Sequence, residues 1–365
     1  MFASIAVAMA VLVGVSPAWG ATTVGAPITV GDSPFGVAFS PDGTTAYVTN
    51  LVDDTVSVIT VATGVVGTPI TVGDQPVGVA FSPDGATAYV TNVADGTVSV
   101  ITVATSTVAS TITVGSGPYG VAFSPDGATA YVTNLVDGTV SVITVATSTV
   151  ASTITVGSDP RGVAFSPDGT TAYVTNFNDD TVSVITVVTN TVASTITVGD
   201  FPVGVAFSPD GATAYVTNGA DDTVSVITVA TGTVGTPITV GDFPIGVAFS
   251  PDGTTAYVTN RADDTVSVIT VATGTVGTPI TVGDFPIGVA FSPDGTTAYV
   301  TNSGADTVSV LNFDPPLAVV PEVVPALAET GVDSLVPLTV GGALLAVGTL
   351  LGFMVMRSRR QVPRL

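Results

Sequence analysis

Cysteine, histidine and lysine are absent from the 365 residues of this chain. Without cysteine no disulfide forms, so stability must come from packing alone. The three absences also exclude Ser-His-Asp triads, thiolate nucleophiles, histidine-ligated metals and lysine Schiff bases. Paired carboxylates remain available for glycoside hydrolysis, but nearly every aspartate lies at a repeated turn position, where turn formation explains it. The residue types therefore predict a protein that is not an enzyme.

Positive charge is equally scarce. Six arginines stand against 28 acidic residues, which gives a net charge of −22. Between residues 21 and 330 the only basic side chains are Arg161 and Arg261. Such a chain cannot neutralise a row of phosphates, so nucleic acid is excluded as a partner. Two arginines also cannot form the arginine cluster of a sialidase-like propeller.

The chain is rich in one repeat. Ser-Pro-Asp-Gly recurs every 42 residues, and each copy is followed by Tyr-Val-Thr-Asn. The copies start at Ser40, Ser82, Ser124, Ser166, Ser208, Ser250 and Ser292. A fixed period of about 20–50 residues is typical of solenoids and propellers.

Each repeat predicts four short antiparallel strands, which is the content of one propeller blade. In the first copy these strands cover Gly36–Ser40, Thr45–Asn50, Thr55–Val61 and Val66–Val72. Proline and glycine fix the hairpin turn between the first two strands. A glycine begins the first strand of every copy, as expected where inner strands crowd around an axis.

The two ends of the repeat array complement each other. Residues 22–31 match the fourth strand of a repeat but precede any first strand, whereas the last repeat ends after its third strand, Thr307–Phe313. The N-terminal strand should therefore complete the last blade and leave no open edge. The predicted fold of residues 21–313 is all-β, a seven-bladed β-propeller of four-stranded antiparallel blades.

The sequence Tyr47-Val48-Thr49-Asn50, preceded by Ser-Pro-Asp-Gly, resembles the YVTN family of β-propeller repeats over roughly residues 22–313. The resemblance implies a secreted or surface protein of bacteria or archaea. It is specific for the fold and does not name an activity, because propellers support unrelated functions.

Residues 1–20 have the features of a secretory signal peptide. An apolar stretch, Ile5–Val15, is followed by Ala18-Trp19-Gly20, which places small residues where a signal peptidase cuts. No basic residue precedes the apolar stretch, and a buried N-terminal strand is the alternative interpretation.

The C-terminal end combines a Pro-rich spacer (314–326), a pentapeptide, an apolar segment (335–356) long enough to cross a bilayer, and an arginine-rich tail. This order, over residues 327–365, resembles a Gram-positive cell-wall sorting signal of the Leu-Ala-x-Thr-Gly form. The resemblance implies that a sortase, its partner, recognises Leu327, Ala328, Glu329, Thr330 and Gly331. It would cut after Thr330 and join that residue to the cell-wall precursor, so the membrane span would be transient. A permanent transmembrane anchor is the alternative.

The repeats differ in two short stretches, one around the proline between blades and one just after Tyr-Val-Thr-Asn. Both lie in loops on the same face of a four-stranded blade, so the variation should gather on one rim. Exposed aromatic side chains near a propeller axis suit a recognition surface. The candidate binding face comprises Phe201, Val203, Phe243, Ile245, Phe285, Ile287, Arg261, Asp159, Arg161, Phe177 and Asn178. The alternatives are that these residues plug the channel mouth or that the repeats have drifted there.

No cofactor is expected. Calcium is the metal that a site with only oxygen ligands would suit, and one repeated turn carries Asp53, Asp95, Asp137, Asp179, Asp221 and Asp263. The simpler interpretation is that each of these side chains caps its own turn.

Taken together, the sequence predicts a wall-anchored propeller on the cell surface. It would bind an unidentified extracellular protein or glycan as an adhesion or display module, without catalysis. One alternative is a structural component of a surface coat. Another is a surface hydrolase or lactonase-like enzyme, which the absence of histidine, cysteine and lysine disfavours.

Overall fold

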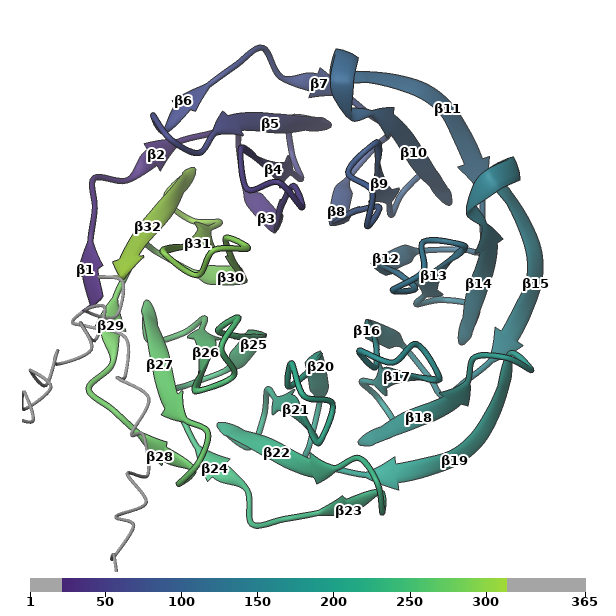
Figure 1. Ribbon diagram of the computed structural model, residues 1–365, viewed down its shortest axis with the longest axis vertical. Helices are drawn as coiled ribbons and strands as arrows, with labels where there is room; N and C mark the ends of the chain where they lie inside the picture. The colour runs from purple at the N-terminus through teal and green to yellow at the C-terminus, as the bar shows by residue number, and fades with distance from the viewer. Residues whose placement is uncertain (1–21, 314–365) are drawn as a thin grey trace, which may run out of the picture. The chain divides into compact units, whose positions relative to one another are not determined.

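The computed structural model describes residues 22–313, which form a ring of seven blades around a central axis (Figure 1). This confirms the predicted fold. The predicted signal peptide (1–20), spacer (314–326) and sorting signal (327–365) lie outside the described residues. Within residues 22–313 no helix is both long and apolar enough to span a membrane.

The blades are antiparallel sheets whose strands follow one another from the axis outward (Figure 1). The first contains β3 (Pro34–Phe39), β4 (Thr45–Asn50), β5 (Thr55–Thr60), β6 (Val65–Val66) and β7 (Ile70–Thr71). The second contains β8 (Pro76–Phe81), β9 (Thr87–Asn92), β10 (Thr97–Thr102) and β11 (Thr107–Thr113). The third contains β12 (Pro118–Phe123), β13 (Thr129–Asn134), β14 (Thr139–Thr144) and β15 (Thr149–Thr155). The fourth contains β16 (Pro160–Phe165), β17 (Thr171–Asn176), β18 (Thr181–Thr186) and β19 (Thr191–Thr197).

The remaining three blades follow the same order. The fifth contains β20 (Pro202–Phe207), β21 (Thr213–Asn218), β22 (Thr223–Thr228), β23 (Thr233–Val234) and β24 (Ile238–Thr239). The sixth contains β25 (Pro244–Phe249), β26 (Thr255–Asn260), β27 (Thr265–Thr270), β28 (Thr275–Val276) and β29 (Ile280–Thr281). The seventh contains β30 (Pro286–Phe291), β31 (Thr297–Asn302) and β32 (Thr307–Phe313). Two short 3-10 helices, η1 (Val103–Thr105) and η2 (Val145–Thr147), precede β11 and β15.

The N-terminal segment closes the ring as predicted. β1 (Thr22–Val24) and β2 (Ile28–Thr29) both pair antiparallel with β32, so the last blade gains its outer strand from the opposite end of the chain. Ile28 and Val30 pack against the buried cluster that contains Tyr299 and Val308. This cluster joins the last blade to the first.

The outer strands differ from the prediction in one respect. The continuous strand expected over residues 66–72 is divided in the structure into β6 and β7. Pro69 lies in the gap, and proline has no backbone N–H to donate to the sheet. In the second, third and fourth blades Ala-Ser-Thr replaces Gly-Thr-Pro, and the outer strand runs unbroken for seven residues.

The repeated Tyr-Val-Thr-Asn sequence joins neighbouring blades. The Tyr47 ring is buried against Phe81 of the next blade, with centroids 4.6 Å apart. The Thr49 hydroxyl accepts the N–H of Gly36 at 2.8 Å and donates to the carbonyl of Val77 in the next blade at 2.8 Å. The equivalent threonine donates to the next blade at all seven junctions.

The glycine that starts each repeat is required by this close packing. A β-carbon on Gly36 would lie well inside van der Waals contact with the carbonyl oxygen of Val77. The same holds for Gly120 against Arg161. The inner strands therefore approach so closely that no side chain fits, as the sequence predicted.

Candidate functional site at the channel mouth

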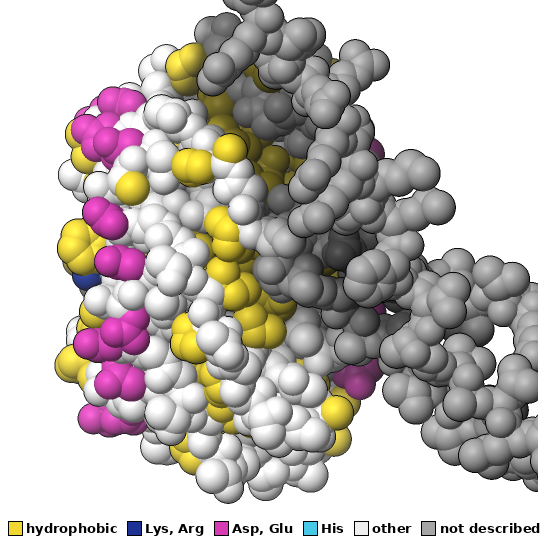
Figure 2. Space-filling view, turned by 90° about the vertical axis from the view of Figure 1, so that its left-hand side faces the viewer, with side chains coloured by type: hydrophobic (Ala, Val, Ile, Leu, Met, Phe, Trp, Pro, Cys, Tyr) yellow, Lys and Arg dark blue, Asp and Glu magenta, His cyan; other side chains and the backbone are white. Residues whose placement is uncertain are grey.

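The two variable stretches of the repeat meet on one side of the ring. The N–H of Leu51, just after Tyr-Val-Thr-Asn, donates to the carbonyl of Ser33, just before the proline, at 3.1 Å. Aspartates are frequent in these loops, among them Asp32, Asp53 and Asp54. Figure 2 shows acidic side chains gathered along one face of the ring, with hydrophobic side chains among them.

Across three consecutive blade boundaries, the residue before the proline packs against the residue after Asn of the preceding blade. The rings of Phe201 and Phe177 stack with centroids 4.7 Å apart. The guanidinium of Arg261 lies 5.2 Å from the ring of Phe285. The ring of Phe243 lies against Gly219, which has no side chain. The two variable positions are therefore contact partners, which the repeat pattern alone did not show.

The candidate binding face divides into exposed and inward-facing residues. Phe201 and Phe285 are 41% and 47% exposed, and Phe243 is partly buried. Arg261 and Asn178 are exposed, whereas Asp159, Arg161 and Phe177 are partly buried. Four of the candidate residues directly follow the proline and line the axial channel rather than the exposed rim: Arg161, Val203, Ile245 and Ile287. The residue before the proline precedes the strand and, at Phe201, Phe243 and Phe285, has a positive φ, so it does not follow the alternation of the strand and can point away from the channel.

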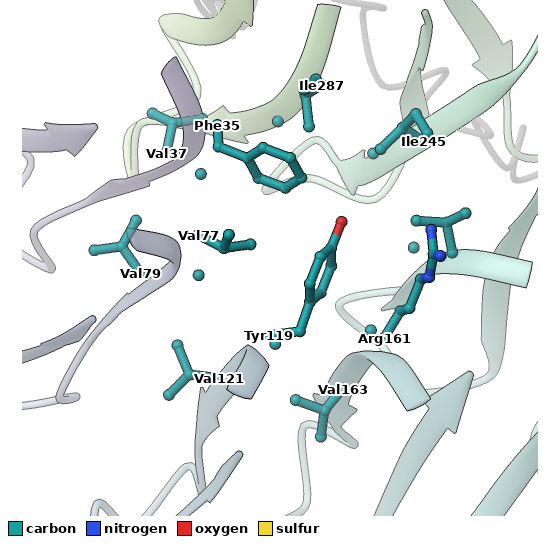
Figure 3. A pocket seen from close by; sticks show the side chains of 18 of the residues that line it. Phe35, Val37, Val77, Val79, Tyr119, Val121, Arg161, Val163, Ile245 and Ile287 are labelled. Carbon is teal, nitrogen blue, oxygen red and sulfur yellow. The ribbon is translucent and has the colours of Figure 1, made fainter. Parts of the chain in front are cut away.

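The channel mouth is a cavity of about 220 Å³. Each blade contributes the side chain after its proline, and these seven residues are Phe35, Val77, Tyr119, Arg161, Val203, Ile245 and Ile287 (Figure 3). Only Tyr119 and Arg161 are polar, and they come from adjacent blades. The candidate binding face predicted from the sequence contained Arg161 but not Tyr119, Phe35 or Val77, which lie at the same position of the repeat. Tyr119 could have been recognised from the sequence, because it and Arg161 are the residues with a polar group at a repeat position that is otherwise apolar or aromatic.

Arg161 is held by its neighbours. Its Nη2 donates to Oδ2 of Asp159 at 3.1 Å, and its Cζ lies 3.4 Å from the centre of the Phe177 ring. The Nε–H is buried and has no hydrogen-bond partner among the described residues. A guanidinium carries five N–H donors and Asp159 accepts from Nη2, so the other terminal N–H groups of Arg161 remain as donors for a ligand.

Tyr119 supplies a second donor in the same cavity. Its ring meets Phe35 edge-on, with centroids 5.6 Å apart. Figure 3 shows its hydroxyl pointing into the channel between Phe35 and Arg161. Burial raises the pKa of Tyr119 to about 12, although the charge of Arg161 acts in the opposite direction. The phenol is therefore neutral at physiological pH and can donate its proton in a hydrogen bond.

The repeated aspartates have a different role from the predicted one. Each does not cap its own turn. Instead, Oδ2 of Asp53 accepts the N–H of Asp32, in the loop that enters the same blade, at 2.8 Å. Across residues 22–313, no group of three or more acidic side chains is arranged to hold a metal ion.

Comparison with known proteins identifies a family to which the chain is similar. The family model described as "Lactonase, 7-bladed beta-propeller" matches residues 34–204, 79–236, 146–281 and 205–327. Among solved structures, the chain is similar to one described as Kuenenia stuttgartiensis hydrazine synthase, with a TM-score of 0.72 and 25% identity. That similarity covers 77% of this chain and 95% of the other. A search of curated proteins finds no match.

The family match contradicts the prediction that the protein is not an enzyme, and that prediction is wrong. The residue types excluded only mechanisms that need histidine, cysteine or lysine. A neutral phenol, a guanidinium and carboxylates can still supply hydrogen bonds, positive charge and a proton acceptor at a channel mouth. The match extends over nearly the whole ring, and the chain therefore belongs to the lactonase family of seven-bladed β-propellers.

Proposed function

We propose that the protein binds a small ester of the lactone type at the mouth of its axial channel and hydrolyses it there. The observation that supports this most directly is the break in the repeat at Tyr119 and Arg161. These two residues place polar donors side by side on a wall that is otherwise apolar or aromatic. The name of the matched family supports ester chemistry at this position.

The side chains can serve such a reaction in distinct ways. Attack of water on an ester places negative charge on the carbonyl oxygen, and fixed donors stabilise that charge. The guanidinium of Arg161, whose side chain is 23% exposed, and the neutral hydroxyl of Tyr119 are the donors in the channel mouth. Asp159 is bonded to Arg161 and lines the neighbouring groove between the third and fourth blades, and we assign it as the carboxylate that accepts a proton from the attacking water. The ring C–O bond then breaks, and the alkoxide that leaves takes this proton, so that Asp159 is regenerated.

The size and lining of the cavity define the substrate. A volume of about 220 Å³ fits a single small ring better than a drug-sized molecule. The apolar side chains of Ile245 and Ile287 would contact the body of the ring, while the polar pair would hold its carbonyl group.

Hydrolysis can be followed with the purified protein and a panel of small lactones, by titrating the acid released. Arg161→Ala should lower kcat/KM by about a hundredfold, because it removes a donor to the developing oxyanion. Tyr119→Phe should lower it too. Arg261→Ala removes the other described arginine, which lies outside the channel, and should leave the rate unchanged. An unreactive wild-type protein, or equal effects of the two arginine variants, would refute the proposal.

A second candidate function is recognition of an extracellular protein or glycan by the rim. Phe201 and Phe285 are exposed and are held at φ of 57° and 53°, a region that large side chains rarely adopt. The resemblance to YVTN repeats and to a Leu-Ala-x-Thr-Gly sorting signal also supports attachment to the cell wall through Thr330. Probing a glycan and protein array with the wild type and a variant in which Phe201, Phe243 and Phe285 are serine tests this function. Equal binding by both proteins would contradict it.

A further inference from the structure

Five of the seven blade junctions share a backbone-to-carboxylate hydrogen bond, which we call the interblade latch. An aspartate Oδ1 in one blade accepts the N–H of the residue before the proline of the next blade, at 2.8–3.0 Å. The aspartates are Asp54, Asp180, Asp222, Asp264 and Asp306. At these junctions a carboxylate therefore binds this backbone N–H.

Two junctions lack the latch because glycine replaces the aspartate, at Gly96 and Gly138. Among residues 22–313, the N–H groups that the missing carboxylates would bind, those of Gly117 and Asp159, have no hydrogen-bond partner. These two N–H groups belong to the loops that carry Tyr119 and Arg161. The two loops that lack the latch are therefore the same two loops that place a polar side chain in the channel wall.

The two unlatched junctions are not equivalent. At the first, Leu135 and Val136 pack against Gly117. At the second, the absence of a side chain on Gly138 accompanies a groove of about 730 Å³ between the third and fourth blades. Asp159 and Arg161 line this groove, and Arg161 also lines the channel mouth. The groove and the channel therefore share one guanidinium.

We propose that a carboxylate of the ligand occupies the place of the missing aspartate side chain at position 138. It accepts the backbone N–H of Asp159 and pairs with the guanidinium of Arg161. The five latched junctions show within this molecule that the same backbone geometry binds a carboxylate. The substrate class narrows accordingly to esters that also bear a free carboxylate.

The acidic side chains around the groove do not prevent a ligand carboxylate from binding there. Asp137 and Asp179 line the groove, but each already accepts a backbone N–H, from Ser116 and Ser158 respectively. Asp180 follows Asp179 directly in the sequence, and its carboxylate forms the latch bond although it has no arginine partner. A neighbouring negative charge therefore does not prevent a carboxylate from binding this backbone N–H. Asp159 also lines the groove, but its carboxylate is bonded to Nη2 of Arg161 at 3.1 Å, so these two charges offset each other. The guanidinium keeps further N–H donors for a ligand carboxylate, and more distant charges are screened by salt.

The inference deepens the proposed function and rests on it, because Arg161 belongs to both sites. Its test uses binding, with 4-hydroxybutyrate as the carboxylate probe. Titration of the full chain is followed by calorimetry and by the amide shift of Asp159. Gly138→Asp supplies the missing carboxylate from the protein, and φ of 62° there matches the 54–56° of the latch aspartates. This variant should bind the probe about tenfold more weakly or worse, because the charged hydrogen bond is already made.

Matched variants make the result specific. Gly96→Asp makes the same change at the neighbouring junction and should leave probe binding within about twofold, since that latch lies outside the groove. Asp54→Gly opens a latch onto Gln75, which is bonded to Val93 and not to an arginine loop, and should create no additional binding. Thermal melting of each variant checks that the ring is intact.

The outcomes separate this inference from the proposed hydrolysis. Undiminished binding by Gly138→Asp, an equal loss in Gly96→Asp, or no binding by the wild type would overturn the carboxylate site. Hydrolysis of neutral lactones as fast as carboxylate-bearing ones would also overturn it, although the proposed hydrolysis would stand. Binding that depends on Gly138, in a protein that hydrolyses no ester, would support the site and refute the hydrolysis.

Discussion

Deleting residues 22–31 removes the strands that close the ring. β1 and β2 pair with β32, and no other described strand lies on that edge. Without them the last blade keeps three strands, and β32 presents unpaired backbone groups to solvent. The contacts between the last and first blades that remain include the bond from Thr301 to the carbonyl of Phe35.

The expected loss follows from the buried side chains. Ile28 and Val30 pack against the cluster around Tyr299 and Val308, and both are partly buried. Burial of an aliphatic side chain contributes about 1.5–3 kcal/mol when complete, so the two together contribute about 2–4 kcal/mol. A change of 1 kcal/mol shifts the melting temperature of a domain near this size by about 2 °C. The deletion should therefore lower the melting temperature by about 4–8 °C.

Thermal melting followed by circular dichroism, with the full chain as reference, measures this shift. Sedimentation should also show self-association, because an exposed strand edge pairs with other chains. A permuted chain provides the control: it starts at residue 32 and carries residues 22–31 after β32, joined by the Ala-Thr-Gly turn used in other blades. This chain should recover the full melting temperature. If the deletion melts at the same temperature as the full chain and remains monomeric, the closure argument is refuted.

Three further predictions concern the core, the channel and the C-terminal end. Thr217→Val leaves two backbone groups without their hydroxyl partner, the N–H of Gly204 in the same blade and the carbonyl of Ile245 in the next, and should lower the free energy of unfolding by about 2–4 kcal/mol in urea. Thr231→Val, at an exposed position, should change it little. In the folded state the pKa of Tyr119 is about 12, above the ordinary value of 10.0 for a tyrosine, so stability should fall as the pH rises from 10 to 12. Tyr119→Phe should reduce this loss by about 2–3 kcal/mol, and an unchanged pH profile would contradict the raised pKa. Thr330→Ala should move the protein from the cell-wall fraction to the membrane or the medium, and unchanged release by a wall-digesting enzyme would refute sortase attachment.

Features that depend on neighbours in sequence could be predicted from the sequence. In the Ser-Pro-Asp-Gly turn, Oδ1 of Asp42 accepts bonds from the hydroxyl of Ser40 and the N–H of Thr44, only two residues away on either side. These bonds also lower the pKa of Asp42. Such turns repeat every 42 residues and delimit strands of suitable composition. The number of blades, the order of their strands and the closure of the ring followed from this local chemistry and from the incomplete ends of the array.

The candidate site depends on contacts between blades, and only the tertiary structure decided it. Tyr119 and Arg161 are one full repeat apart in the sequence, and the curvature of the ring brings them to the same cavity. Asp53 bonds to a loop 21 residues before it, so its role could not be read from its own turn. The replacement of aspartate by Gly138 is visible in the sequence, but its consequence is not. The aspartate at this position bonds to an N–H group in the next blade, and only the tertiary structure shows that pairing. Local turns and strand patterns are encoded in short stretches, whereas the pairing of surfaces between blades is set by how the whole ring packs.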